Sequence, residues 1–178
     1  MQLEWARLIG GDTLIVAPLS IAKQTEREAN KIDLEISYVR SMEDVKPGIN
    51  ITNYEMIEHF NPEKFKAVVL DESSILKSLN GKTKKKLIEM FHDTDYKLCC
   101  TATPAPNDIA EMANHAEFLG VMTRQEMLSA FFVHDTEWRL KKHAQEPFYR
   151  WLASWGMAVK TPSNLGYSDE GYILPELN

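Results

Sequence analysis

The 178-residue chain has few cysteines, no long apolar run and no excess of positive charge. Its two cysteines, Cys99 and Cys100, are adjacent, and neighbouring side chains on a strand point to opposite faces. We therefore expect buried thiols rather than a disulfide or a zinc cluster. No segment approaches the roughly 18 apolar residues that cross a bilayer, and the N-terminus lacks the pattern of a secretion signal. These absences predict a cytoplasmic protein with no membrane partner.

The charge balance also limits contact with nucleic acid. The 26 acidic residues outnumber the 20 basic ones, which gives a formal net charge of −6, so any such contact must be local. Basic residues gather in two clusters, one with Lys77, Lys82, Lys84, Lys85 and Lys86, the other with Arg139, Lys141, Lys142 and His143. We interpret both clusters as solvated helix faces.

The hydrophobic pattern is typical of an α/β fold. Short apolar runs rich in β-branched residues alternate with stretches of helical period, as expected of strand-helix units that build a parallel sheet. The expected strands cover residues 13–17, 36–39, 49–52, 67–70 and 97–101, and the expected helices between them cover residues 20–31 and 83–92.

The C-terminal third has an all-helical pattern. Asn107 is a candidate N-cap, and Thr123 and Glu126 have the spacing of a capping box. Aromatic residues between 148 and 155 recur as on a packed helix face. We divide the chain into a domain of residues 1–122, a helical extension of residues 123–161, and a linker of residues 162–178.

The first candidate site lies where the strand at residues 67–70 runs into Asp71 and Glu72. Ligands of open parallel sheets bind beyond the carboxyl ends of the strands. One carboxylate can hold a hydrated Mg²⁺ against nucleotide phosphates, and the other can orient the attacking water. A strand end whose acids simply cap the next helix would show the same pattern.

A second strand ends in hydroxyl groups close to the same sheet edge, at Thr101 and Thr103. These hydroxyls could bind the carboxylates or sense a γ-phosphate. An ordinary Thr-rich strand end before Pro104 is the alternative, but the two segments together are more specific than either alone.

Four motifs in this order resemble those of Swi/Snf-like phage and prophage helicases of superfamily 2, the DEAD/DEAH-box group. They are Leu14-Ile-Val-Ala-Pro18 for motif Ia, Ile51-Thr-Asn-Tyr54-Glu55 for the Tyr-Glu stretch, Asp71-Glu72-Ser-Ser-Ile-Leu76-Lys77 for motif II, and Thr101-Ala-Thr-Pro104 for motif III. Ser73 and Ser74 depart from the Ala-His that the family commonly has.

This resemblance implies a three-layer RecA-like sheet of the P-loop NTPase type, and a nucleic-acid-dependent ATPase or helicase that moves along DNA. In the complete protein Asp71 would bind Mg²⁺, Asp71 and Glu72 would be catalytic, and Asp71, Thr101 and Thr103 would contact ATP. The resemblance places Pro18, Ser20, Asn53 and Tyr54 beside the nucleic acid and assigns coupling to Ser73, Ser74 and Lys77. A second RecA-like domain is an implied partner.

One family element is absent from these residues. The Gly-x-x-x-x-Gly-Lys-Thr loop that cradles phosphates does not occur, and Gly10-Gly11 lacks a following Lys. We expect the chain to begin inside the helix after that loop, at about residues 3–9, and to hydrolyse no ATP alone. Without the strand that bears the loop, residues 98–101 should form an exposed apolar sheet edge that favours self-association.

Two other functions stay open. A catalytically dead module of the same fold could bind DNA or a protein partner. A metal-dependent phosphohydrolase could use Asp71 and Glu72, but it would need further ligands at strand ends, and the spacing of His115, His134 and His143 does not supply them.

Overall fold

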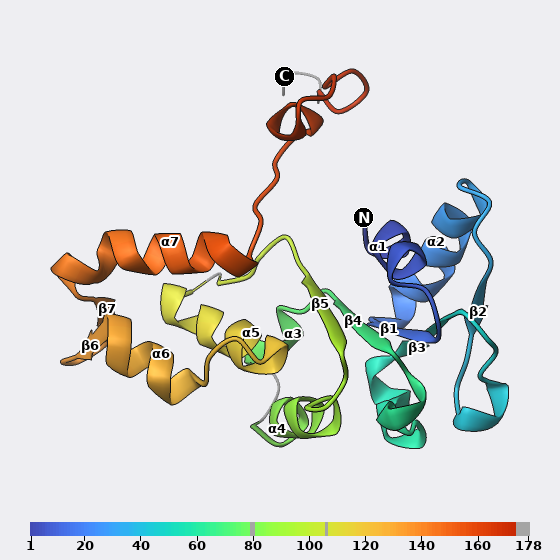
Figure 1. Cartoon of the computed structure of the whole chain (residues 1–178), viewed down its shortest axis with the longest axis horizontal. Helices are drawn as coiled ribbons and strands as arrows, with labels where there is room; N and C mark the ends of the chain where they lie inside the picture. The colour runs from blue at the N-terminus through green and yellow to red at the C-terminus, as the bar shows by residue number, and fades with distance from the viewer. Residues whose placement is uncertain (79–80, 106, 174–178) are drawn as a thin grey trace.

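A five-stranded parallel sheet with helices on both faces forms the centre of the molecule (Figure 1). The computed structural model describes residues 1–78, 81–105 and 107–173. The strands are β1 (Thr13–Ala17), β2 (Ile36–Tyr38), β3 (Ile49–Asn53), β4 (Ala67–Asp71) and β5 (Tyr96–Cys100), in the order β2-β3-β1-β4-β5. Every expected strand is confirmed to within one residue at each end, and so is the α/β fold class.

Alternation along the strands divides the core into two layers. In β1, Leu14 and Val16 pack on one face while Ile15 and Ala17 pack on the other. The second face is covered by two helices, α1 (Gln2–Ile9) and α2 (Leu19–Asn30). The first face is covered by η2 (Tyr54–His59), α3 (Ile75–Ser78), α4 (Gly81–Met90) and α5 (Met112–Leu119). Burial on both faces explains why the central strands are continuously apolar.

A third cluster of buried residues lies in the C-terminal lobe. It is built from α6 (Arg124–Phe131), β6 (Phe132–His134), β7 (Trp138–Leu140) and α7 (Gln145–Trp155), around the fully buried Phe148. The all-helical expectation is wrong here, because β6 and β7 form an antiparallel hairpin. Its strands are only three residues long, too short for their alternation to be told from a helical pattern.

The expected helix ends are partly confirmed. Thr123 and Glu126 form the expected capping box of α6. Asn107 is not a cap, because Asp108 instead accepts a hydrogen bond from the Ala110 amide at 2.9 Å. The short helices η1 (Met42–Asp44), η3 (Pro62–Lys64), η4 (Ile109–Glu111), η5 (Lys142–Ala144) and η6 (Pro162–Leu165) complete the described elements.

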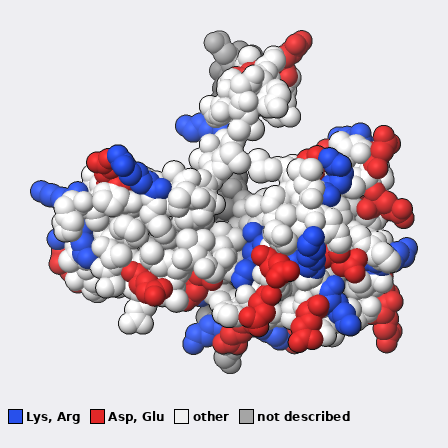
Figure 2. Space-filling model, in the orientation of Figure 1, with Lys and Arg blue, Asp and Glu red and all other residues white. Residues whose placement is uncertain are grey.

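Acidic and basic side chains intermingle on the face drawn in Figure 2, with no broad basic area there. Several lysines of the two basic clusters are engaged by the fold. Lys84 donates to the Asn114 side chain at 2.8 Å, and Lys86 forms an ion pair with Glu58. Lys141 donates to the carbonyl of Ser129 at the end of α6. The described lysines of the first cluster lie on α4, as interpreted, but the second cluster is not a helix face, because Arg139 lies on β7 and Lys141 lies between β7 and η5.

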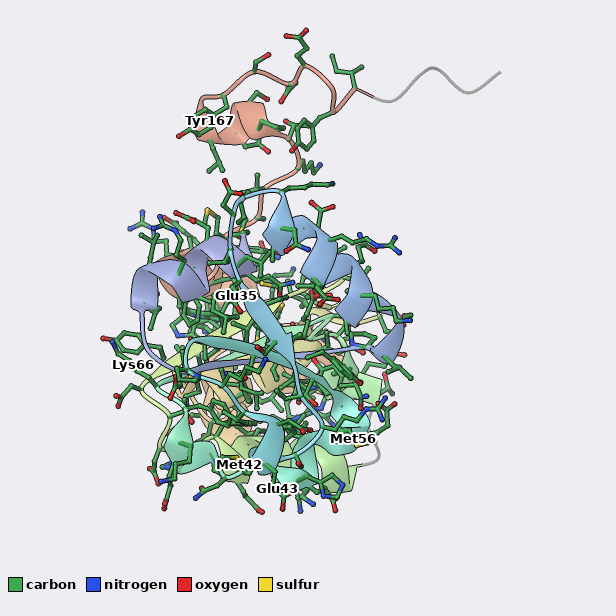
Figure 3. All side chains as sticks on the ribbon, turned by 90° about the vertical axis from the view of Figure 1, so that its right-hand side faces the viewer. Glu35, Met42, Glu43, Met56, Lys66 and Tyr167 are labelled. Carbon is green, nitrogen blue, oxygen red and sulfur yellow. The ribbon has the colours of Figure 1, made fainter. Side chains whose placement is uncertain are left out.

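The chain leaves the body after α7. Figure 3 shows Tyr167 on this tail, away from the sheet, and its side chain is 72% exposed. The last five residues of the expected linker, 174–178, lie outside the described residues. No helix in the described part of the chain has the length and apolarity that crossing a membrane requires.

Candidate functional site at the carboxyl rim of the sheet

The carboxyl ends of the five strands share one rim, and the predicted site residues follow them. The register pairs Ala17 with Asn53, and Asp71 with Cys100. Because β4 and β5 are adjacent and parallel, Asp71 and the segment from Thr101 to Thr103 lie at the same edge of the sheet. The expected meeting of the acidic and the hydroxyl-bearing strand ends is therefore confirmed.

Asp71 is held by three hydrogen bonds. Its carboxylate accepts hydrogen bonds from the Gln2 amide group of α1, at 2.9 Å, and from the Glu72 backbone amide, at 3.1 Å. Its backbone carbonyl accepts one from the Tyr54 hydroxyl of η2, at 2.8 Å. Gln2 was not predicted, and a glutamine at the start of a chain gives no sequence signal for such a contact.

Glu72 occupies a strained turn directly after β4. Its φ of 54° lies in the left-handed region, which costs a non-glycine residue roughly 1 kcal/mol. Its carboxylate accepts hydrogen bonds from the hydroxyls of Ser74, at 2.5 Å, and Thr101, at 2.9 Å. The expected bond between a hydroxyl and a carboxylate is thus present for Thr101, whereas Thr103 is exposed and contributes its backbone amide to the Thr101 hydroxyl.

Ser73, the next residue, points into the interior. Its hydroxyl lies 3.1 Å from Nε2 of His115 on α5, and its backbone amide donates to the Cys100 carbonyl at 2.9 Å. Burial lowers the pKa of His115, so the imidazole is neutral near pH 7. Burial also raises the pKa of Cys99 to about 12. Both cysteines are free thiols, but they are half-buried rather than buried as expected.

The four residues that the resemblance places beside nucleic acid divide into two pairs. Pro18 precedes α2 and Ser20 is exposed in its first turn. Asn53 and Tyr54 are buried, at 3% and 7% exposure, and both side chains are hydrogen-bonded within the protein. Burial raises the pKa of the Tyr54 hydroxyl well above its usual range. Only Pro18 and Ser20 therefore offer surface to a ligand.

The remaining coupling residue, Lys77, lies in α3, but its side chain is outside the described residues. Ser74, by contrast, is placed directly on the Glu72 carboxylate. Of the predicted coupling residues, Ser74 therefore contacts the Glu72 carboxylate, and Ser73 contacts His115.

The carboxylates suit one kind of metal site. Among the described residues, no group of three or more His, Cys, Asp or Glu side chains could hold a metal ion. Mg²⁺ bound to a nucleotide commonly takes only one or two carboxylates, with waters and phosphates as its other ligands. The partly exposed carboxylate of Asp71 fits such a site, and a closed site made of protein ligands alone does not fit.

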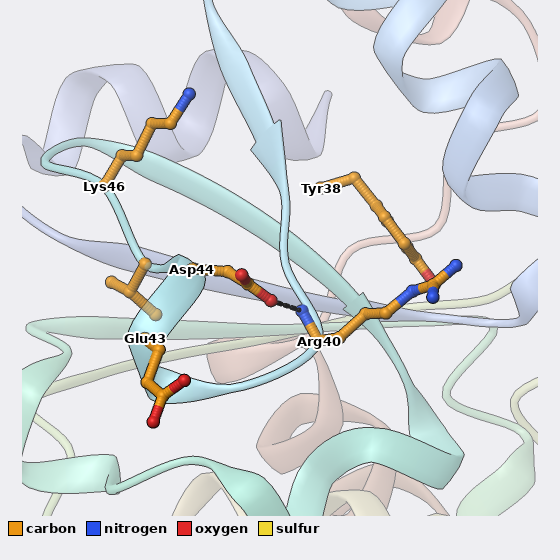
Figure 4. Close-up of a pocket in the computed structure, with 6 residues that line it drawn as sticks. Tyr38, Arg40, Glu43, Asp44 and Lys46 are labelled. Carbon is orange, nitrogen blue, oxygen red and sulfur yellow. Dashed lines mark hydrogen bonds between the residues drawn. The ribbon is translucent and has the colours of Figure 1, made fainter.

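A shallow pocket lies elsewhere on the molecule, after β2 (Figure 4). It is lined by Tyr38, Arg40, Glu43, Asp44, Val45 and Lys46, and the Arg40 guanidinium stands 5.9 Å from the Tyr38 ring. The strands β3 and β1 separate β2 from β4. Three inter-strand spacings amount to roughly 14 Å, so this pocket is not part of the acidic site.

Comparison with known proteins identifies the family and the fold. Residues 7–145 match the SNF2-related domain family. The fold is similar to the Sulfolobus solfataricus SWI2/SNF2 ATPase core in complex with dsDNA, with a TM-score of 0.59 and 23% identity over 72% of this chain. The similar region covers 30% of that chain, and at this identity the likeness shows the RecA-like α/β fold. A comparison with curated proteins found no match. Because the family match extends over most of its length, the chain belongs to the SNF2-related domain family.

Proposed function

We propose that this chain is part of the first motor domain of a DNA-dependent ATPase that moves along DNA. The observation that carries the proposal is the acidic turn, where Asp71 and Glu72 leave an interior strand and the Thr101 hydroxyl of the next strand lies 2.9 Å from the Glu72 carboxylate. Membership of the SNF2-related family supports an ATPase, and the similar structure bound to dsDNA supports DNA as the partner.

The side chains of the turn have distinct roles in this proposal. Asp71, fixed by Gln2 and Tyr54, would hold the Mg²⁺ that accompanies ATP, which supplies positive charge against the phosphates. Glu72 would orient and polarise the attacking water. Thr101 would hold the Glu72 carboxylate in place and, through its contact with the Thr103 amide, connect it to the segment facing the γ-phosphate.

The DNA contact would be local and would lie at the start of α2. Pro18 precedes this helix and provides no side-chain cap, so the backbone amides of Leu19 and Ser20 are available to a phosphate oxygen, next to the exposed Ser20 side chain. Asn53 and Tyr54 would act indirectly, because their side chains are buried and hold the rim together. A second RecA-like domain would complete the ATP clamp and move when the γ-phosphate is lost.

The DNA arm of the proposal is tested by fluorescence anisotropy with labelled duplex DNA at low ionic strength. We expect weak binding that falls with added salt and that Ser20→Glu reduces, because a carboxylate at the helix start repels phosphate. Ser129→Glu, at an exposed position of α6, is the matched control and should bind like the unmodified chain. Equal binding by both variants, or no binding at low salt, would count against this site.

The ATP arm is tested by phosphate release. The 178 residues contain no phosphate-cradling loop, so we expect no turnover by this chain with or without duplex DNA, and Glu72→Gln should look the same. Hydrolysis by the unmodified chain above the Glu72→Gln variant would show that the site is complete as it stands.

A binding module of the same fold is the second candidate, favoured by the missing loop sequence alone. The two are distinguished in the longest natural form of the protein. DNA-stimulated hydrolysis that Glu72→Gln abolishes supports the motor, whereas DNA binding without hydrolysis supports the module.

A further inference from the structure

We propose that His115 is a positioning residue for Glu72, acting through the buried hydroxyl of Ser73. The catalytic meaning of this contact rests on the proposed function of Glu72, but the contact itself does not. His115 lies on α5, 42 residues from Ser73 along the chain, and its Nε2 is 3.1 Å from the Ser73 hydroxyl oxygen.

The burial of the pair makes the contact significant. The Ser73 side chain is fully buried and His115 is 3% exposed, so water does not readily replace either partner. A buried polar group that loses its partner carries the full cost of desolvation. Substitution on one side of this contact therefore leaves an unsatisfied group on the other side.

The turn that carries Asp71 and Glu72 needs contacts that fix it, because its backbone conformation is strained. Glu72 has a left-handed φ of 54°, and a non-glycine residue keeps that conformation only when its surroundings fix it. The following residues are fixed from both sides, since the Ser73 amide donates to the Cys100 carbonyl and the Leu76 amide donates to the Ser73 carbonyl, each at 2.9 Å. The His115 contact adds a side-chain anchor from a different layer of the molecule.

The hydrogen-bonding chemistry selects one tautomer of His115. The Ser73 hydroxyl also contacts the Cys99 side chain, so it can accept from Nε2–H and donate to the sulfur. Nδ1 is buried and has no partner among the described residues. An unpaired acceptor is tolerated more often than an unpaired N–H donor, so we expect the proton on Nε2.

The position of α5 determines what the contact between His115 and Ser73 connects. This helix packs against β5, α3 and α4 of the motor fold and also against α6 of the C-terminal lobe. His115 therefore connects the turn that carries Glu72 to the helix that joins the two parts of the molecule. A displacement of α5 would reach the turn that carries Glu72 through this contact.

Two substitutions at His115 separate positioning from simple packing. In His115→Gln the terminal amide can reach the place of Nε2, whereas in His115→Asn the shorter amide reaches only the place of Nδ1. Amide hydrogen exchange of residues 73–76 in the full chain should be about tenfold faster in His115→Asn, as for the loss of one buried hydrogen bond, and close to the original rate in His115→Gln. Ser73→Ala should match His115→Asn.

A second readout concerns Glu72 directly. The carboxyl carbon resonance of Glu72 should shift in His115→Asn and Ser73→Ala and return toward its original position in His115→Gln. Nitrogen NMR of the unmodified chain should show His115 protonated on Nε2, and this measurement does not depend on any variant folding. Equal behaviour of the Gln and Asn variants, an unmoved Glu72 resonance in Ser73→Ala, or a proton on Nδ1 would each overturn the proposal. None of these readouts involves ATP or DNA, so a failure of the motor hypothesis would be visible separately.

Discussion

Tyr54 shows how a residue of a recognisable motif can act inside the protein rather than on a ligand. Its hydroxyl donates to the Asp71 carbonyl at 2.8 Å, and its side chain is 7% exposed. Tyr54→Phe removes this donor and leaves a partly buried carbonyl without it, so we expect the free energy of unfolding to fall by about 1–3 kcal/mol. Urea denaturation measures this loss. Tyr167→Phe is the control, because that hydroxyl is on the exposed tail; equal stability of both variants would contradict the role given to Tyr54.

The buried imidazole of His115 predicts a dependence of stability on pH. Burial lowers the pKa of His115 in the folded protein below its ordinary value of 6.5, despite the opposing effects of Ser73 and the Glu111 carboxylate. The unfolded chain then binds the additional proton first as the pH falls. The contribution of neutral His115 is therefore complete above about pH 6.5 and is lost progressively below it.

Denaturation of the chain and of His115→Gln across pH 5 to 8 measures this dependence. The stability of the unmodified chain should decline relative to the variant as the pH falls below the ordinary histidine range. A difference between the two proteins that stays constant with pH would contradict the assignment of a lowered pKa to His115.

At the scale of elements, the C-terminal lobe depends on one aromatic side chain. Phe148 is fully buried, and the rings of Phe131, Phe132 and Trp151 surround it with centroids 5.4 to 5.7 Å away. Phe148→Ala should lower the free energy of unfolding by about 3–5 kcal/mol, because it leaves a cavity where the lobe is closed. Tyr167→Ala, at a 72% exposed position on the tail, should have a much smaller effect. Denaturation followed by tryptophan fluorescence measures the free energy of unfolding of both variants. Similar decreases in the two variants would contradict the central role of Phe148 in the lobe.

The elements differ in how far the sequence alone could define them. The central strands were located to within one residue, because burial on both faces gives them continuous apolar runs. The β6–β7 hairpin was missed, since three-residue strands carry too little alternation to distinguish them from a helix. The cap of η4 was misplaced by one residue, from Asp108 to Asn107, because both side chains can cap a helix and local geometry selects between them.

At the scale of the whole molecule, β5 is one of the two edge strands of the sheet within the described residues, as the sequence predicted, but residues 98–101 are half-buried rather than exposed. The Tyr96 amide donates to Lys66, and the Cys100 carbonyl accepts from Ser73, so these alternate backbone groups face β4. The backbone groups of Lys97 and Cys99 therefore face away from the sheet. Their N–H and C=O groups form a template for another strand.

We therefore expect this chain to associate with itself as its concentration rises, which light scattering over a dilution series measures. Cys99→Pro removes an outward N–H and should reduce association while the β4–β5 ladder persists. Leu98→Pro removes an inward N–H and should unfold the sheet edge instead. A clean monomer at high concentration would contradict this expectation.

The amino-acid sequence was sufficient to place Asp71 and Glu72 at a strand end next to Thr101, because strand positions and the common rim of parallel strands follow from local hydrophobic patterns and a general rule of topology. Only the packed structure decided which side chains hold that turn. Gln2 meets Asp71 across 69 residues and His115 meets Ser73 across 42. Contacts between such distant residues depend on how α1 and α5 settle on the sheet, and no local pattern in the chain specifies the final position of a side chain in that packing.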